Sequence, residues 1–177
     1  MVAMLKPIIK LLKALNGNIK KSQIAAGFSM GVLLGLIPAG NVFWIAIFVV
    51  SFFFNHHHWS KILAMVVVKL FLGLLNPLLD SAGWWVLHIG ALQPFFTSLY
   101  NIPLVPLTGF NNTLVAGGLF LGMALWLPVF FLILLLVPLY RNKLIPGIRE
   151  SKIYKSILKF PLFPVLEKVL KAASAGQ

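Results

Sequence analysis

The ionisable side chains inside the apolar middle of this chain are few, and their spacing is the first chemical signal. Between residues 22 and 140 the basic residues are Lys61 and Lys69, and the acid is Asp80. Lys69, Asn76 and Asp80 stand at i, i+7 and i+11. A helix over residues 62–79 would therefore carry these three side chains on one face.

Lys69 would lie near the middle of that helix, where a charge in lipid costs about 2.5–3.5 kcal/mol. This cost favours a partner, an aqueous cavity or a phosphate, so Lys69, Asn76 and Asp80 are candidate lipid head-group residues. Lys69 and Asp80 are roughly 16 Å apart along a helix and cannot pair directly. The alternative is that Lys69 snorkels or meets a carbonyl group freed at a break near Pro38.

The consecutive residues His56, His57 and His58 invite a metal interpretation. Consecutive residues of a helix point in different directions, however, whereas a helical metal pair is spaced i, i+4. The chain has no Cys, so a thiolate ligand and a Cys nucleophile are excluded. No nucleophile–base–orienter set is present either. We therefore expect no metal site, no cofactor and no enzymatic activity, and we interpret the histidines as an interfacial loop.

Composition places the elements that must position these residues in a membrane. The 177 residues are 60% hydrophobic and 10% charged, with a mean hydropathy of +0.96. A soluble domain carries about 25% charged residues, so a soluble globular protein is nearly excluded. The net charge of +12 would suggest nucleic acid in a soluble protein. In a chain this apolar it indicates anionic lipid head groups instead, and no nucleic acid.

The positive charge lies at the two ends of the chain and predicts its topology. Residues 1–21 read as a basic amphipathic helix suited to the membrane interface, and residues 141–177 form a basic amphipathic tail. The membrane domain is the segment 22–140 between them. Because short basic flanks stay cytoplasmic, we expect both termini in the cytoplasm, an even number of crossings and a bacterial inner-membrane location.

Four apolar stretches, at residues 24–54, 62–79, 84–100 and 114–140, predict an all-α integral membrane protein with two to four spans. The first stretch is interrupted around Pro38, Gly40 and Asn41, and the fourth contains Pro128. Such breaks predict a kinked span or a re-entrant hairpin of two half-helices, with a cavity at the break. Four crossings would put Lys61 outside and Asp80 inside, whereas a re-entrant first hairpin would reverse both.

Two segments 90 residues apart share a pattern. Each has a polar pair, two apolar residues and Ala-Gly, with a Pro eleven positions after that Gly; the copies start near residues 22 and 112. Since the first begins and the second ends at a basic flank, an inverted repeat is one interpretation. The alternative is that Gly and Pro are common in membrane helices. Small-residue ladders that favour helix packing are Gly27, Gly31 and Gly35, and Gly118 and Gly122.

The segment 22–85 resembles a bacterial inner-membrane family defined as a domain of unknown function. The resemblance rests on Ala26-Gly27-x3-Gly31-x3-Gly35-x2-Pro38-x-Gly40, then Asn55, then Asn76-Pro77. This chain departs from the pattern by the histidines after Asn55 and by Leu78, where the family often has Thr. The longer form with a basic extension resembles a subgroup whose genes neighbour large AsmA-like envelope lipid-transfer proteins.

The resemblance implies envelope lipid handling without an established activity. We therefore expect a small inner-membrane subunit that supplies phospholipid to, or anchors, a periplasm-spanning lipid-transfer partner of the AsmA-like class or another membrane subunit. The first alternative is a transporter or channel for a small polar solute, which would use the same broken helices. The second is a purely structural membrane anchor.

Overall fold

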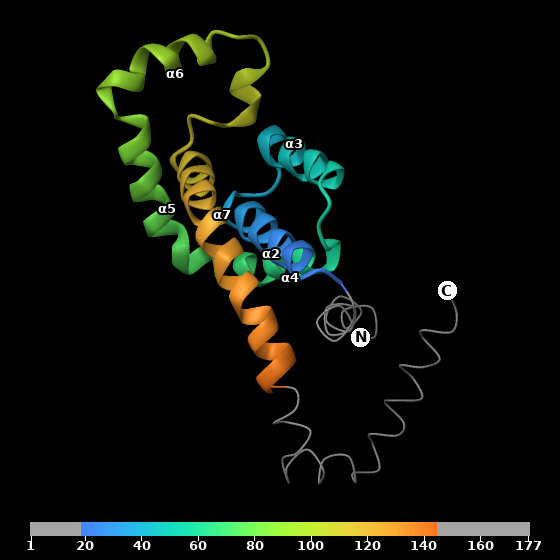
Figure 1. Ribbon diagram of the computed structural model, residues 1–177. Helices are drawn as coiled ribbons and strands as arrows, with labels where there is room; N and C mark the ends of the chain where they lie inside the picture. Colours follow the sequence, from blue (N-terminus) through green and yellow to red (C-terminus); the bar gives the residue numbers. More distant parts are fainter. Residues whose placement is uncertain (1–18, 145–177) are drawn as a thin grey trace. The chain divides into compact units, whose positions relative to one another are not determined.

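The computed structural model describes residues 19–144, and every regular element in that range is helical, as predicted. The chain divides into two compact units, Met1–Val137 and Pro138–Gln177, and the contacts described below belong to the first. The helices are α2 (Lys21–Leu36), α3 (Val42–Val50), α4 (His58–Leu70), α5 (Leu72–Leu87), α6 (Gln93–Tyr100) and α7 (Thr113–Leu139) (Figure 1). Shorter turns are η1 (Ser51–Phe53), η2 (Gly90–Leu92), η3 (Val105–Thr108) and the π-helical η4 (Tyr140–Leu144). The amphipathic segments predicted at the two ends lie almost wholly outside the described residues.

The first apolar stretch folds as a hairpin of two helices, α2 and α3. The chain leaves α2 at Ile37 in an extended conformation and turns at Gly40, whose φ of 97° is readily adopted by glycine. Asn41 then starts α3, because its side-chain oxygen accepts a hydrogen bond from the Trp44 N–H. After η1 the chain returns to its start, where the His57 N–H bonds to the Gln23 carbonyl at 2.9 Å.

Helix α4 packs along α2 in the same direction. A Cβ at Gly27 would meet His57 and Ser60, one at Gly31 would meet Lys61 and Ala64, and one at Gly35 would meet Val68. At each of these glycines the nearest contact would be shorter than 3.0 Å, to a backbone oxygen or to a side-chain Cβ of α4 or of His57 just before it. The ladder at residues 27, 31 and 35 is therefore the face on which α4 rests, the close approach that small residues permit.

The stretch 62–79 is not the single straight helix that we predicted. It divides between α4 and α5, which are bent by 85° at Phe71. The Phe71 N–H bonds to the Val68 carbonyl in a tight turn, and Pro77 cannot donate to the Gly73 carbonyl in the first turn of α5. The prediction that Lys69, Asn76 and Asp80 share one helical face is therefore wrong, because Lys69 belongs to α4 and the other two belong to α5.

Helix α7 is continuous, so the prediction of a break at Pro128 is wrong. One proline removes a single helical hydrogen bond, and no Gly or Asn follows to turn the chain and start a new helix. Among the described residues, Thr113–Asn142 is the one helical stretch long and apolar enough to cross a membrane by itself. The bent pair α4–α5 reaches that length and hydropathy only when its two halves are taken together.

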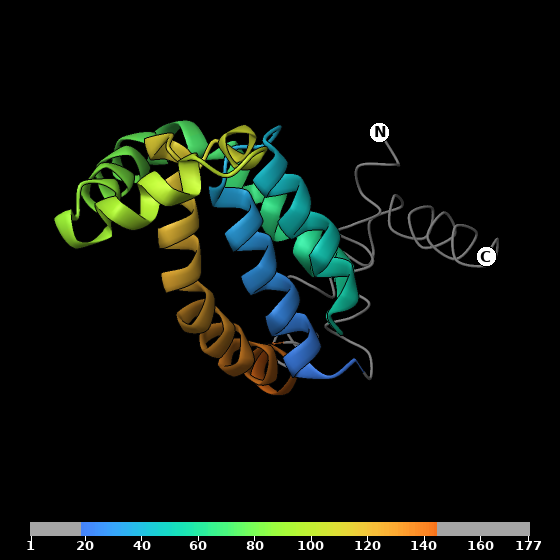
Figure 2. The same ribbon diagram turned by 90° about the horizontal axis from the view of Figure 1, so that it is seen from above.

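Helix α2 lies between α3 and α7 (Figure 2). Gly118 approaches Leu36 and Gly122 approaches Leu33, while Val137 packs with Ile24 at the other end. Helices α2 and α7 are thus antiparallel, the direction that the inverted-repeat interpretation requires. The two copies differ at the proline, however, because the chain breaks after α2 at Pro38 and α7 continues through Pro128.

The closest helix contact in the described part of the chain joins α5 and α7. A Cβ at Gly117 would lie 1.8 Å from the Leu79 carbonyl oxygen, and one at Gly83 would lie 1.8 Å from the Thr113 carbonyl oxygen. The order of these contacts makes the two helices antiparallel.

The apolar stretch 84–100 does not form one helix. It contains the end of α5, the turn η2 and the short helix α6.

Candidate functional site

Lys69 binds the carbonyl groups at the end of α2. Its Nζ donates to the Ile37 carbonyl oxygen at 2.9 Å and to the Gly35 carbonyl oxygen at 3.4 Å. The indole ring of Trp44 lies 5.6 Å from the same ammonium group. A cation at a helix C-terminus is favourable because the helix dipole places partial negative charge there. This geometry is the alternative that the sequence left open, in which the lysine meets carbonyl groups freed near Pro38.

The other polar groups at this break are also bonded. The Trp44 Nε1 donates to the Leu34 carbonyl at 2.8 Å, and the Asn41 Nδ2 donates to the Pro38 carbonyl at 2.8 Å. The break predicted at Pro38, Gly40 and Asn41 is thus confirmed as a break. The three cavities described below lie elsewhere, and none of them is lined by these residues or by Pro128.

Asp80 and Asn76 are remote from the Lys69 contacts. Asp80 accepts a hydrogen bond from the Thr113 hydroxyl and so ties α5 to the start of α7. Asn76 is half-buried on α5, on the other side of the bend from Lys69. The structure does not bring the three predicted head-group residues into one site.

Two adjoining cavities lie where α5, α6 and α7 meet. One has a volume of about 370 Å³ and polar lining residues that include His88, Gln93, Thr97 and Asn111. The other has a volume of about 230 Å³ and is lined by apolar side chains, which are Phe43, Val86, Leu87, Phe95, Phe96, Leu99, Phe110, Val115, Ala116, Leu119, Phe120 and Met123. Leu87, Phe96 and Phe110 line both cavities, so the two adjoin, and the pair is called the amphipathic space below.

The sequence did not identify this space. Its lining comes from four separate segments, and the aromatic residues that form the wall, Phe96 and Phe110, come from opposite sides of an irregular loop. The one local signal was the short, polar-interrupted stretch at residues 84–100. Its Gln93 interrupts an apolar run, and the side-chain Nε2 of Gln93 bonds to the Leu87 carbonyl at the end of α5.

A third cleft, of about 280 Å³, lies beside the histidines that precede α4. His57 is the N-cap of α4, because its Nδ1 accepts a hydrogen bond from the Ser60 N–H at 3.2 Å. Among the residues described, no group of three or more His, Cys, Asp or Glu side chains is arranged to hold a metal ion. His56 lines the cleft and is buried, and neither of its ring nitrogens has a hydrogen-bond partner within residues 19–144.

Acid should destabilise the fold through His56. Burial, the nearby Lys61 and His58 lower the pKa of His56 from 6.5 to about 4. His56 therefore binds a proton near pH 6.5 in the unfolded chain and only near pH 4 in the folded chain. The folding stability is consequently lost as the pH falls from about 6.5 towards 4. Thermal unfolding at pH 7.5 and pH 5 measures this loss. His56→Phe should reduce the difference.

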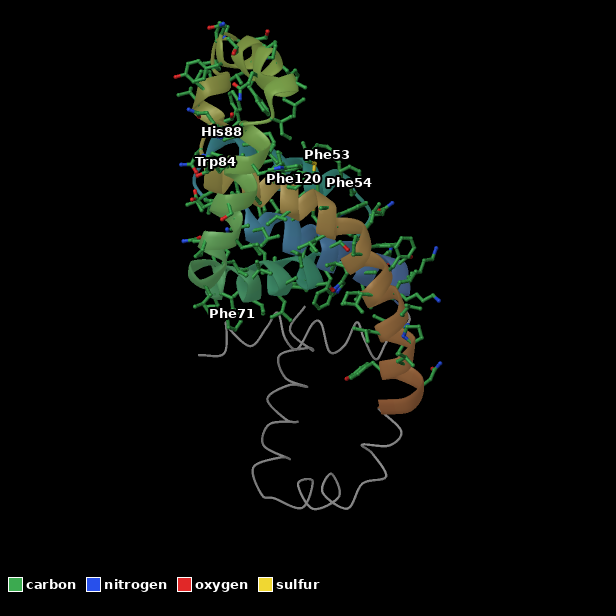
Figure 3. All side chains as sticks on the ribbon, turned by 90° about the vertical axis from the view of Figure 1, so that its left-hand side faces the viewer. Phe53, Phe54, Phe71, Trp84, His88 and Phe120 are labelled. Carbon is green, nitrogen blue, oxygen red and sulfur yellow. The ribbon has the colours of Figure 1, made fainter. Side chains whose placement is uncertain are left out.

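The surface of the described residues is strongly apolar. Phe53, Leu70 and Leu74 are 86%, 77% and 80% exposed. Figure 3 labels the exposed Phe53 and Phe54 at the end of η1, Phe71 at the bend between α4 and α5, and Trp84 on α5. Trp84 and His88 stack on one face of α5, with ring centroids 4.3 Å apart. Exposed apolar area this extensive is unusual for a soluble monomer.

Within residues 19–144, fold and surface define an all-helical structure with one helix long and apolar enough to span a membrane. The chain belongs to the same family as an uncharacterized protein of Treponema pallidum (strain Nichols). The two are 31% identical over 159 residues, which cover 90% of this chain and 98% of that protein. No family model matches the chain, and no solved structure matches it.

Proposed function

We propose that this chain is a multi-pass inner-membrane protein that binds phospholipid and supplies it to a periplasmic lipid-transfer partner. The observation that carries the proposal is the amphipathic space between α5, α6 and α7. The smaller, apolar chamber adjoins a larger chamber in which polar side chains interrupt a mostly apolar lining. This arrangement suits a lipid, whose polar head group is attached to apolar acyl chains. Ligand sites are commonly concave and mostly apolar, with a few polar groups that fix orientation.

Charge and helix direction support an orientation in the bilayer. Lys20 and Lys21 stand at the start of α2, so the positive-inside rule favours a cytoplasmic start for this helix. Because α7 is antiparallel to α2, Thr113 and the amphipathic space then face the periplasm. The Gln23–His57 hydrogen bond favours a first hairpin that re-enters on the cytoplasmic side. The crossings are then α4–α5 and α7, with both termini in the cytoplasm.

The partner is the part of the proposal that rests on resemblance. Genes of the subgroup that this chain resembles neighbour AsmA-like envelope proteins, which bridge membranes and carry lipid. A lipid site that opens in the periplasmic leaflet is where such a partner would collect its cargo. The same orientation would also let this chain serve as the membrane anchor of that partner.

Filling the apolar chamber tests the lipid site. Ala116→Phe adds a ring to a residue that lines the chamber, so the purified protein should lose most of its bound phospholipid while it still folds. The matched control is Ala124→Phe, the same substitution at an exposed residue of α7 that lines neither chamber. Phospholipid per protein is measured by mass spectrometry after purification from native membranes in mild detergent.

Three outcomes would contradict the proposal. Equal lipid content in the Ala116→Phe and Ala124→Phe variants would mean that lipid binds elsewhere. A wild-type chain that carries a small polar solute in place of lipid would favour the transporter or channel. A wild-type chain free of lipid, but still bound to its envelope partner, would favour the structural anchor.

A further inference from the structure

Two helices begin side by side at the end of the molecule remote from the lipid site. Helices α2 and α4 are parallel, and the His57 N–H bonds to the Gln23 carbonyl between their first turns. Parallel helices place the positive ends of both dipoles together. Lys20 and Lys21 are exposed at the start of α2, and the N-cap of α2 makes no side-chain hydrogen bond. Within residues 19–144, this end therefore combines the positive ends of two helix dipoles with the charge of two exposed lysines.

A buried lysine adds to the positive charge at this end. Lys61 is 0% exposed, and its Nζ donates to the Ser51 hydroxyl at 2.7 Å. The ammonium group also lies 3.9 Å from the ring centroid of Phe52 and 5.0 Å from that of Phe48. Among the described residues the acid is Asp80, which bonds to Thr113 on the remote α5–α7 contact. Within that range the charge of Lys61 is consequently stabilised by a hydroxyl group and aromatic faces, without a carboxylate.

The cleft beside these groups is lined by an incompletely bonded histidine. His56 is 8% exposed, and both of its ring nitrogens are buried without a partner among residues 19–144. A neutral imidazole always carries one N–H, so a donor is left unsatisfied at this point. Buried polar groups are nearly always hydrogen-bonded, and an exception indicates a missing partner. The amide side chains of Gln23 and Asn55 line the same cleft of about 280 Å³.

We propose that this cleft binds a phosphate group between the first turns of α2 and α4. The side chains of His56, Gln23 and Asn55 line the cleft and supply hydrogen-bond donors, and the first turn of α2 adds the positive end of its dipole. Lys20, Lys21 and Lys61 supply the charge that favours an anion. Helix N-termini bind phosphate for these reasons. The phosphate belongs either to the head group of an anionic lipid or to free phosphate, and the chemistry of recognition is the same for both.

This site is separate from the proposed lipid site, since it is lined by different residues at the opposite end of α2. Its protonation behaviour supports an anion. Burial is the largest cause that lowers the pKa of His56 to about 4; Lys61 of α4, His58 and His57 lower it further, and the Phe54 backbone opposes them. A bound phosphate would favour the charged form, so the pKa of His56 should rise and binding should tighten as the pH falls.

The test is a histidine NMR titration of the full chain in nanodiscs. With phosphatidylcholine alone the His56 ring signals should titrate at low pH. Either phosphatidylglycerol in the nanodisc or added inorganic phosphate should move the His56 titration towards 6.5. A response to phosphatidylglycerol alone identifies a lipid head group, and a response to inorganic phosphate identifies the free anion. No response of His56 to either would overturn the proposal.

Substitutions at the cleft provide a second measurement. Asn55→Ala removes one donor at an exposed residue and should weaken phosphate-dependent binding about fivefold, the value of one hydrogen bond. Lys61→Met removes a charge and should weaken it about tenfold. If Lys61→Met does not fold, the Asn55→Ala variant and the wild-type titration still test whether the cleft binds phosphate. Unchanged affinity in a folded Asn55→Ala variant, together with an unresponsive His56, would contradict the site.

Discussion

Gly117→Ala is expected to destabilise the chain by about 3 kcal/mol or more, at the upper end of what overpacking costs. The added Cβ would lie 1.8 Å from the Leu79 carbonyl oxygen and 2.9 Å from the Gly83 nitrogen. These are backbone atoms of α5, so no side chain can rotate away to make room. Helices α5 and α7 would have to separate, and the amphipathic space between them would open. Thermal unfolding in detergent, with the folded yield from size-exclusion chromatography, measures the effect.

Gly73→Ala is the matched control for this experiment. Gly73 is also a helical glycine, in α5, but a Cβ there would have nothing within 4 Å. Alanine is favoured over glycine in a helix by up to about 1 kcal/mol, so this variant should be neutral or slightly more stable. If Gly117→Ala and Gly73→Ala unfold at the same temperature, α5 and α7 do not approach as closely as the structure shows.

The ladder in α2 shows how far glycine spacing can be interpreted. The intervals between Gly27, Gly31 and Gly35 predict a packing face, and the structure places α4 on that face. The partner helix could not be predicted, because the spacing describes one surface only. Gly83 carried no signal at all, since its neighbour one turn earlier is Leu79 and the pair resembles no ladder. Its importance arises from the crossing with Gly117, which is a tertiary property.

Prolines in apolar runs were interpreted alike and behave differently. Pro38 ends a helix because Gly40 can turn the chain and Asn41 can start the next helix. Pro128 has apolar neighbours on both sides and stays inside α7, just as Pro77 stays inside α5. A proline followed closely by Gly and Asn is thus the stronger sequence signal for a break.

The bend at Phe71 had no comparable signal, because neither glycine nor proline stands at that position. It occurs where Lys69 is held by the end of α2 while the next helix follows α7. Helices α4 and α5 therefore pack against different helices. A sequence pattern within residues 62–79 cannot report such a conflict, which is why a single helix was predicted there.

The buried Lys61 was also underestimated. The sequence presents it as a lysine just before the apolar stretch 62–79, outside the membrane with four crossings and inside with a re-entrant first hairpin. Its burial depends on Ser51, Phe48 and Phe52, which the hairpin brings back beside α4. The hairpin itself was one of two alternatives that the break at Pro38 left open. The candidate phosphate site thus depends on tertiary structure, and the histidines are the one part of it that the sequence pattern indicates.

Lys69→Met should lower the stability of the chain by about 2 kcal/mol, because carbonyl groups at the end of α2 would lose their donor. The Ile37 and Gly35 oxygens have the Lys69 Nζ at 2.9 and 3.4 Å. Lys69→Arg keeps a positive charge and a donor, so it should recover part of the loss. Thermal unfolding and bound phospholipid are both measured, since the two roles considered for this lysine affect them differently.

Leu70→Met is the control, because Leu70 is the next residue of α4 and is 77% exposed. That substitution should change neither stability nor lipid content. A less stable Lys69→Met variant that retains lipid in proportion to its folded fraction would support the role of Lys69 at the helix end. A Lys69→Met variant of normal stability that has lost its lipid would instead restore the head-group hypothesis. In that case the carbonyl groups near Pro38 would need another donor, and the amphipathic space between α5 and α7 would no longer account for the bound lipid alone.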